Sequence, residues 1–566
     1  MRRILYLIHR WTGIAMCALM ALWFVSGMVM LFVGYPKLTP AERLAALPPL
    51  AAGCCIEPAQ ALARSHHPAA VQAITLTSIA GRAHYQLLEQ DGRTTQLDAA
   101  TGALAPKPDT QAAVAAARMF KPGVPARYAG LVEEDRWTHS RGLNPHRPLH
   151  VVELDDDAAT RVYVSSATGQ VMLDAPRAER YWNFAGAWLH WLYMLRQQNT
   201  DPVWTWTLIG LSAVGVLSAV TGMANGMQRW RFKGRYKSGA RTPYRDFAMR
   251  WHHVLGLAFG LVLCTWMFSG LMSMNPLGVF NARGARPDAA AMQGGSPASV
   301  RLAQPVAQVL ALLHTQSFKP RELEWRVLGG EPFIVARDGH NDTRIVAAGG
   351  HGLSPAKRCD TYIGTTCDDG LTVANQCDTR IAATCGHGLP VKKPCDTHIA
   401  ATCDHGLAVA KQCDTRISAI CGDGLTVTKQ WEPARLEAVA RKLLPYPVSA
   451  FELVTKADAY YYQRGDASMY GGNERRLPAL RVVFDDPGHT WVYLDAATGQ
   501  VALSIDSTQR VGRWLFNFLH SWDVPALLSP VHGWARIAVL IALSAGGLLL
   551  SATAVVIAVR RLRRMA

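Results

Sequence analysis

Four histidines occupy matching positions in two halves of the 566-residue sequence. His9 and His252 each precede a glycine by four residues, and His190 and His520 each follow a leucine. Neutral imidazole is a common metal ligand, and ionisable side chains at membrane depth are costly and usually mark a functional site. The four residues are therefore candidate ligands of a metal-containing group.

An internal duplication predicts how these histidines pair. Ile8–Gly13 and Trp251–Gly256 match at an offset of 243 residues, and a tryptophan and a Ser-Gly dipeptide follow both segments at the same spacing. A second match, at an offset of 330 residues, runs without a gap from Val162 to Trp204. Related halves would meet about a pseudo-two-fold axis, which pairs His9 with His252 and His190 with His520 as axial imidazoles. The alternative is that these histidines are interfacial residues without a ligand.

Two other histidines are the substitutes if one assignment is wrong. They are His253, which aligns with Arg10 of the first half, and His532. We expect both to support the site or to lie at the membrane interface.

Membrane helices must position these residues. Four segments lack Asp, Glu, Lys and Arg over a length that can cross a bilayer, which takes about 20 apolar helical residues. They are Trp11–Pro36, Val203–Gln228, Val254–Ala282 and Ile537–Val559. The first segment has no convincing cleavage site after it, so we expect an uncleaved anchor.

The charge distribution predicts the orientation. The chain has a formal net charge of +16, with 49% hydrophobic and 18% charged residues. Most of the excess positive charge lies at the N-terminus, in the loop 229–250 and in the C-terminal tail, so the positive-inside rule places these pieces in the cytoplasm. No basic patch remains for nucleic acid, and the 17 tryptophans exclude a largely disordered chain. The long polar segments then lie on the periplasmic side of a bacterial inner membrane.

The second half contains an insertion. An 18-residue unit occurs five times over residues 341–430, and these 90 residues account within three for the 87-residue difference between the two offsets. Four units carry two cysteines each. Regularly spaced cysteines outside the cytoplasm favour disulfides, while a largely disordered insert and a metal array are the alternatives. We expect no catalytic role for the insert.

The other polar segments have the pattern of small α+β modules. Residues 58–67 have helical composition, residues 71–77 and 84–88 alternate as strands, and a further helix is expected over residues 432–444. An Asp-x-x-Thr-Gly turn begins at Asp98 and recurs in the second half.

A helix followed by strands that end in this turn resembles the PepSY module. Helices that begin His-x-x-x-Gly, with Leu-His before the return helix, resemble the PepSY-associated transmembrane family of bacterial inner-membrane proteins. The resemblance covers nearly the whole chain except the 18-residue repeats. It implies a four-span α-helical bundle from an internal duplication, with α+β PepSY-like periplasmic domains.

The predicted organisation alternates spans and domains. In chain order we expect a first transmembrane helix (1–36), a PepSY-like domain (37–182) and a His-bearing helix with the second span (183–228). A basic loop (229–250) and a third span (251–282) follow. Next come a second PepSY-like domain (283–340 and 431–510), interrupted by the repeats (341–430), and a His-bearing segment with the fourth span and a basic tail (511–566).

The resemblance also implies two b-type haems held by His9, His190, His252 and His520, and reduction of ferric siderophores or other ferric chelates in the periplasm. Gly13, Gly27, Gly256 and Gly270 could let a porphyrin lie close to the helices. The loop 229–250 is too short for a flavin domain, so electrons must come from a separate cytoplasmic flavoprotein or from quinol in the lipid. Two alternatives remain: a non-redox PepSY regulator of a periplasmic protease, and an electron-relay subunit for a periplasmic oxidoreductase.

Overall fold

The computed structural model describes residues 2–197, 201–300, 302, 304–348, 425–465, 468 and 474–565, together with short strands at 361–367, 379–380, 400–401 and 413–419. The chain forms two compact units, residues 1–347 with 427–566, and residues 348–426. The predictions about the repeat cysteines concern side chains outside the described residues.

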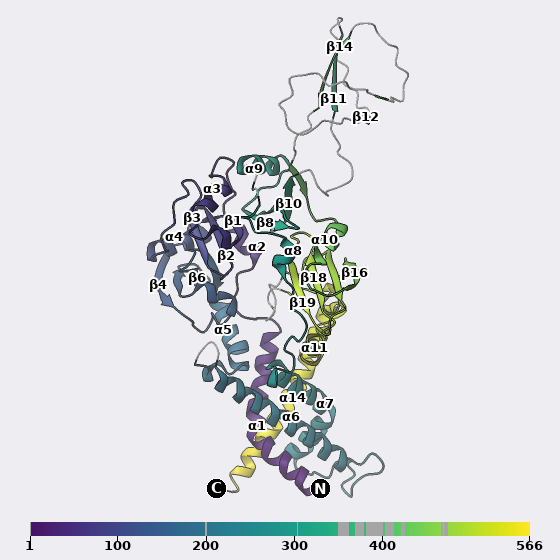
Figure 1. The fold of residues 1–566 in the computed structure, drawn as a ribbon. Helices are drawn as coiled ribbons and strands as arrows, with labels where there is room; N and C mark the ends of the chain where they lie inside the picture. The colour runs from purple at the N-terminus through teal and green to yellow at the C-terminus, as the bar shows by residue number, and fades with distance from the viewer. Residues whose placement is uncertain are drawn as a thin grey trace. The chain divides into compact units, whose positions relative to one another are not determined.

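Four long helices form a bundle in the first unit (Figure 1). They are α1 (Arg2–Met30), α6 (Pro202–Arg229), α7 (Phe247–Ser273) and α14 (Pro530–Leu562). All four are long and apolar enough to cross a membrane, which confirms the predicted spans. Helices α1 and α7 each contact both α6 and α14, and the two chain termini lie at the same end of the bundle (Figure 1).

Helices α1 and α7 do not begin and end where the charge-free segments of the sequence do. Helix α1 begins nine residues before Trp11, because arginine is compatible with a helix and limits only its apolar part. Helix α7 ends at Ser273 instead of continuing to Ala282, since Asn275 and Leu277 adopt left-handed conformations around Pro276.

The core of the bundle is built from equivalent aromatic residues of both halves. Trp23 and Trp266, which the duplication aligns, are both buried, and Trp266 packs against Phe24 with ring centroids 5.8 Å apart. Methionines fill the space around them, namely Met16, Met20 and Met267. The duplication in sequence is therefore a duplication in packing.

A seven-stranded sheet joins the two halves beyond the bundle. Its order is β15-β10-β9-β8-β1-β2-β3, and its bounds are β1 (Val71–Ile79), β2 (Arg82–Glu89), β3 (Thr94–Asp98), β8 (Glu322–Leu328), β9 (Glu331–Arg337), β10 (Thr343–Ala348) and β15 (Leu425–Thr428). Strands β1 and β8 pair antiparallel at the junction, with Thr75 opposite Glu324. Antiparallel pairing of equivalent strands is what a pseudo-two-fold axis requires.

Two four-stranded sheets repeat the same design. The first contains β4 (Ala126–Val132), β5 (Leu149–Leu154), β6 (Arg161–Ser165) and β7 (Val171–Ala175), and the second contains β16 (Val448–Val454), β17 (Ala479–Phe484), β18 (Trp491–Asp495) and β19 (Val501–Ile505). The last three strands of each sheet have bounds that differ by 330 residues, the offset found in the sequence.

The predicted helices and strands of these domains are confirmed with small changes at their ends. The strands expected at 71–77 and 84–88 are β1 and β2. The helices expected at 58–67 and 432–444 are the shorter α3 (Pro58–Ala63) and α10 (Pro433–Ala440).

The 18-residue repeats begin and end inside the seven-stranded sheet. The first unit supplies β10 and the fifth supplies β15, and these two strands are neighbours at one edge. In the second unit β11 (Thr361–Cys367) occupies the position that β10 occupies in the first. The first, second and fifth units thus each contain a strand at a corresponding place, namely β10, β11 and β14 (Cys413–Ala419).

Candidate functional site

The first histidine pair lies at the end of the bundle that carries the chain termini, and we call it the termini-side pair. His9 of α1 and His252 of α7 face each other with ring centroids 6.1 Å apart and planes inclined by 28°. Nδ1 of His9 lies 3.0 Å from the Ser218 carbonyl oxygen of α6. Nδ1 of His252 lies 3.2 Å from the Thr553 hydroxyl of α14. All four membrane helices thus contribute to this site.

The second pair, His190 and His520, lies at the opposite end of the bundle, and we call it the domain-side pair. The ring centroids are 6.2 Å apart with planes inclined by 75°. Nδ1 of His190 lies 3.0 Å from the Ser26 hydroxyl of α1, and Nδ1 of His520 lies 3.0 Å from the Ser269 hydroxyl of α7. The duplication therefore places a serine beside each of these histidines.

The backbone around this pair is also duplicated. Each histidine follows a π-helical turn, η3 (Phe184–Trp188) before His190 and η6 (Arg513–Phe518) before His520. Each also precedes by two residues a left-handed residue, Leu192 (φ 49°) or Trp522 (φ 51°). Single π-helical turns are frequent at functional sites, and a left-handed leucine or tryptophan is strained. Both halves thus keep the same unfavourable conformations around the candidate ligand.

Hydrogen bonding assigns one tautomer to all four histidines. A carbonyl oxygen accepts only, so His9 must donate Nδ1–H to Ser218. The hydroxyls beside the other three rings already donate to carbonyl oxygens, since Ser26 donates to Leu22, Ser269 to Trp266 and Thr553 to Leu550. They therefore accept Nδ1–H from the histidines, and each Nε2 keeps its lone pair for a metal.

Burial keeps the domain-side pair neutral. It lowers the pKa of His190 to about 3, with a further contribution from the neighbouring His520. Burial and the Arg464 guanidinium lower the pKa of His520 to about 4. Neutral imidazole is the form that binds a metal ion.

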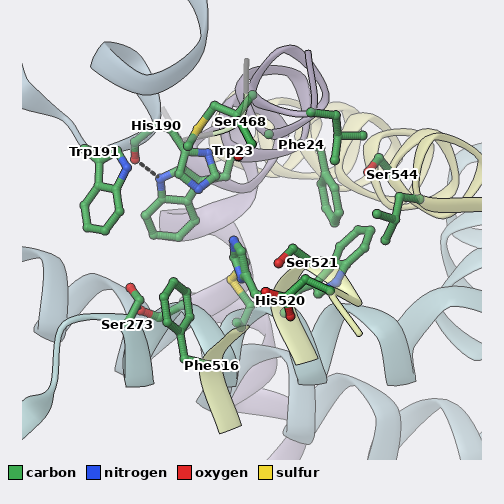
Figure 2. A pocket seen from close by; sticks show the side chains of 18 of the residues that line it. Trp23, Phe24, His190, Trp191, Ser273, Ser468, Phe516, His520, Ser521 and Ser544 are labelled. Atoms are coloured by element: carbon green, nitrogen blue, oxygen red, sulfur yellow. Dashed lines mark hydrogen bonds between the residues drawn. The ribbon is translucent and has the colours of Figure 1, made fainter. Parts of the chain in front are cut away.

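Each pair faces a cavity. The cavity at the termini-side pair has a volume of about 500 Å³, and the cavity at the domain-side pair has a volume of about 230 Å³. In the latter, His190 and His520 face the same space from opposite sides, and Trp23 Nε1 donates to the His190 carbonyl at 2.9 Å (Figure 2).

The predicted glycines line these cavities. Gly13 and Gly256 line the termini-side cavity, and Gly27 and Gly270 line the domain-side cavity. A Cβ at Gly270 would meet no atom within 4 Å, and a Cβ at Gly27 would lie 3.6 Å from the His190 ring. At Gly222 a Cβ would lie 2.5 Å from the His9 ring, so glycine is needed there for the histidine to fit.

Neither substitute histidine is placed to bind a group in a cavity. Both nitrogens of His253 are occupied, Nδ1 at 2.7 Å from the Thr242 hydroxyl and Nε2 at 2.8 Å from the Gly226 carbonyl oxygen. His532 is exposed, with Nδ1 beside the Ser529 hydroxyl. The structure thus gives His253 a structural role between the loop and α6.

The paired histidines fit a metal with two axial imidazoles. Metal–nitrogen distances of roughly 2 Å would separate the centroids of two trans imidazoles by about 6 Å, close to the 6.1 and 6.2 Å observed. Among the described residues there is no group of three or more His, Cys, Asp and Glu that could enclose a metal ion. The donor set suits a metal whose other ligands come from a macrocycle.

Some site residues are missed by sequence reasoning. The spacing of Ser26 and Ser269 is part of the duplication, so that signal was present. Nothing in the sequence pattern indicates the charged residues Arg464, Asp523 and Arg536, which line the domain-side cavity. The duplication does not repeat them.

The family model of the PepSY-associated TM region matches residues 6–561. A search of curated proteins found no match.

Proposed function

The chain belongs to the family of the PepSY-associated TM region, and from this premise we propose that it is a di-haem electron-transfer protein of the bacterial inner membrane that reduces ferric siderophores or other ferric chelates in the periplasm. The finding that supports the proposal best is the geometry of the two histidine pairs. In each pair the rings are about 6 Å apart, face a cavity and keep Nε2 available. A non-redox protein would have no need to maintain this arrangement twice.

The ligand assignment follows from these contacts. His9 and His252 would hold one haem, and His190 and His520 the other. Bound haem iron supplies one-electron transfer. The serine and threonine hydroxyls orient the imidazoles, and the buried aromatic residues around Trp23 and Trp266 exclude water.

The two pairs are spaced for transfer across a membrane. Ser26, which contacts His190, lies 17 positions after His9 in α1. At 1.5 Å per residue this is about 25 Å, most of a hydrocarbon core of about 30 Å. Electrons from a cytoplasmic flavoprotein or from quinol would reach the termini-side pair first.

Charge supports this orientation. The loop between α6 and α7 is rich in arginine and lysine, and so is the end of α14. Arg560 of α14 pairs with Asp246, the N-cap of α7, at 3.0 Å. Basic residues at this end of the bundle favour a cytoplasmic location for it.

Reduction itself needs little protein chemistry at the iron. One electron converts Fe(III) in the chelate to Fe(II), and the lower charge weakens its bonds to hard oxygen ligands. The protein need only bring the chelate close to the domain-side haem.

A visible spectrum tests the proposal. Protein purified in detergent from haem-replete cells should contain about two haems per chain with a low-spin, six-coordinate spectrum, as expected for two axial imidazoles. A colourless preparation would exclude the redox function and favour the protease-regulator alternative.

A further inference from the structure

The domain-side cavity is lined by apolar residues from both halves of the chain and by charged residues from one half only. Its charged lining residues are Arg464, Asp523 and Arg536, all from the second half of the chain. Apolar side chains of both halves line the rest, including Trp23, Phe24 and Leu208 of the first half and Trp266, Met267 and Leu540 of the second. A cavity of this kind suits a ligand that is apolar along most of its surface and anionic at one edge.

Several arginines gather around one buried carboxylate at this cavity. The Asp523 carboxylate, 1% exposed, binds Arg464, lies 3.1 Å from Nη1 of Arg513 and accepts from the Tyr462 hydroxyl. Arg536 donates from Nη1 to the Ser521 carbonyl at 2.7 Å, while its Nε is buried without a partner. Among the described residues of this cluster, one carboxylate thus faces three guanidinium groups. A buried guanidinium nitrogen without a partner is costly, so Arg536 favours an anion in the cavity.

The charged residues break the symmetry of the site. The histidines and their serine partners are duplicated, whereas Arg513, Asp523 and Arg536 correspond at the offset of 330 residues to Asn183, Tyr193 and Trp206. Two equivalent imidazoles cannot fix the rotation of a flat ligand within its own plane. Guanidinium groups on one side can, because they bind carboxylates strongly and with defined geometry.

We propose that Arg464 and Arg536 bind the two carboxylate groups of the tetrapyrrole held between His190 and His520, and thereby turn its anionic edge toward the second half of the chain. This inference rests on the proposed di-haem function. Asp523, itself bound by Arg513, holds Arg464 in place, and Arg536 binds from the first turns of α14. The apolar edge of the ligand then points away from these arginines.

The test compares haem with its dimethyl ester, in which both carboxylates are masked. Full-length protein carrying His252→Ala, expected to retain only the domain-side haem, is freed of haem and titrated with each compound. We expect it to bind haem more tightly than the ester. Arg536→Gln, which leaves the Asp523 cluster intact, should weaken haem binding by roughly tenfold or more, the usual effect of losing a hydrogen bond to a charged group. Adding Arg464→Gln should weaken it further.

Ester binding serves as the folding control, because it should be the same in all these variants. Arg441→Gln is the charge-matched control. It removes the exposed arginine at the C-cap of α10, which does not line the cavity, and should leave both affinities unchanged. Equal preference for haem over the ester in the Arg464/Arg536 variant and in its parent would overturn the inference. So would an unchanged preference combined with slower reoxidation by a carboxylate-bearing ferric chelate, which would assign the arginines to substrate. Failure of the parent to bind either compound would instead contradict the di-haem function.

Discussion

Individual hydroxyl groups decide which nitrogen of each histidine can bind a metal. Ser26 and Ser269 donate to carbonyl oxygens of their own helices and so can only accept from the imidazole. This leaves the lone pair on Nε2, the atom that a metal in the cavity would need. The serines are therefore positioning residues for the candidate ligands.

We predict that Ser26→Ala lowers the affinity of the domain-side site for haem by roughly 10–100-fold, the usual effect of losing a partner of a metal-binding histidine. The measurement is a haem titration of the apoprotein, with the axial ligand field followed by electron paramagnetic resonance. Ser26→Thr should restore the affinity because it keeps the hydroxyl. Ser212→Ala, which removes a hydroxyl from the same cavity without touching a histidine contact, should have little effect. Equal effects of Ser26→Ala and Ser212→Ala would show that the serine acts through packing alone.

The ligand pairing makes a separate prediction. His9→Ala or His252→Ala should remove one haem and leave the domain-side haem, so that the haem content falls from about two to about one per chain, as expected for two axial ligands per iron. Quantitative haem extraction measures this. His532→Ala replaces an exposed histidine and should keep both haems. Loss of both haems, or of neither, in the His252 variant would mean that the ligands are paired differently.

At the scale of helices and strands, the repeats supply two strands of the seven-stranded sheet. Because the first unit contains β10 and the fifth contains β15, removal of all five units would delete two strands of the seven-stranded sheet. Removal of four units would keep both strands and leave them as close in sequence as two segments of a single unit. The number of units removed should therefore decide the outcome.

We predict that deletion of residues 350–421, which is four 18-residue units, preserves membrane insertion, haem content and thermal stability. This deletion joins Gly349 to Gly422 and removes all eight repeat cysteines. Deletion of residues 341–430 should lower the melting temperature, because β9 would lose its neighbour β10 and expose buried residues such as Val335, which pairs with Ile345 in the intact sheet. Differential scanning calorimetry of the two deletions compares them directly. Loss of haem binding after deletion of residues 350–421 would show that the insert supports the bundle.

The same elements show what sequence can and cannot predict. The spans, the paired histidines and strands such as β1 follow from apolar length, duplication and alternation, which are properties of the sequence itself. The π-helical turn before His190 does not, since no local pattern distinguishes it from an ordinary helix. The cluster around Asp523 was also missed, because residues far apart in the chain come together there only through folding. Duplication identifies what the halves share, and the charged cluster is a feature in which they differ.

At the scale of the whole molecule, the two histidine pairs and the domains give the proposed electron path a direction. The pair near the basic loops would receive electrons, and the pair near the sheet domains would release them. The dithionite-reduced protein should therefore be reoxidised by a ferric hydroxamate under anaerobic conditions, with Fe(II) captured by a ferrous chelator. His520→Ala should slow this reaction strongly while the termini-side haem stays reducible, because the exit haem loses an axial ligand. Stopped-flow absorbance measures both steps. If ferric chelates leave the reduced spectrum unchanged and a periplasmic protein reoxidises it, the chain is an electron-relay subunit instead of a chelate reductase.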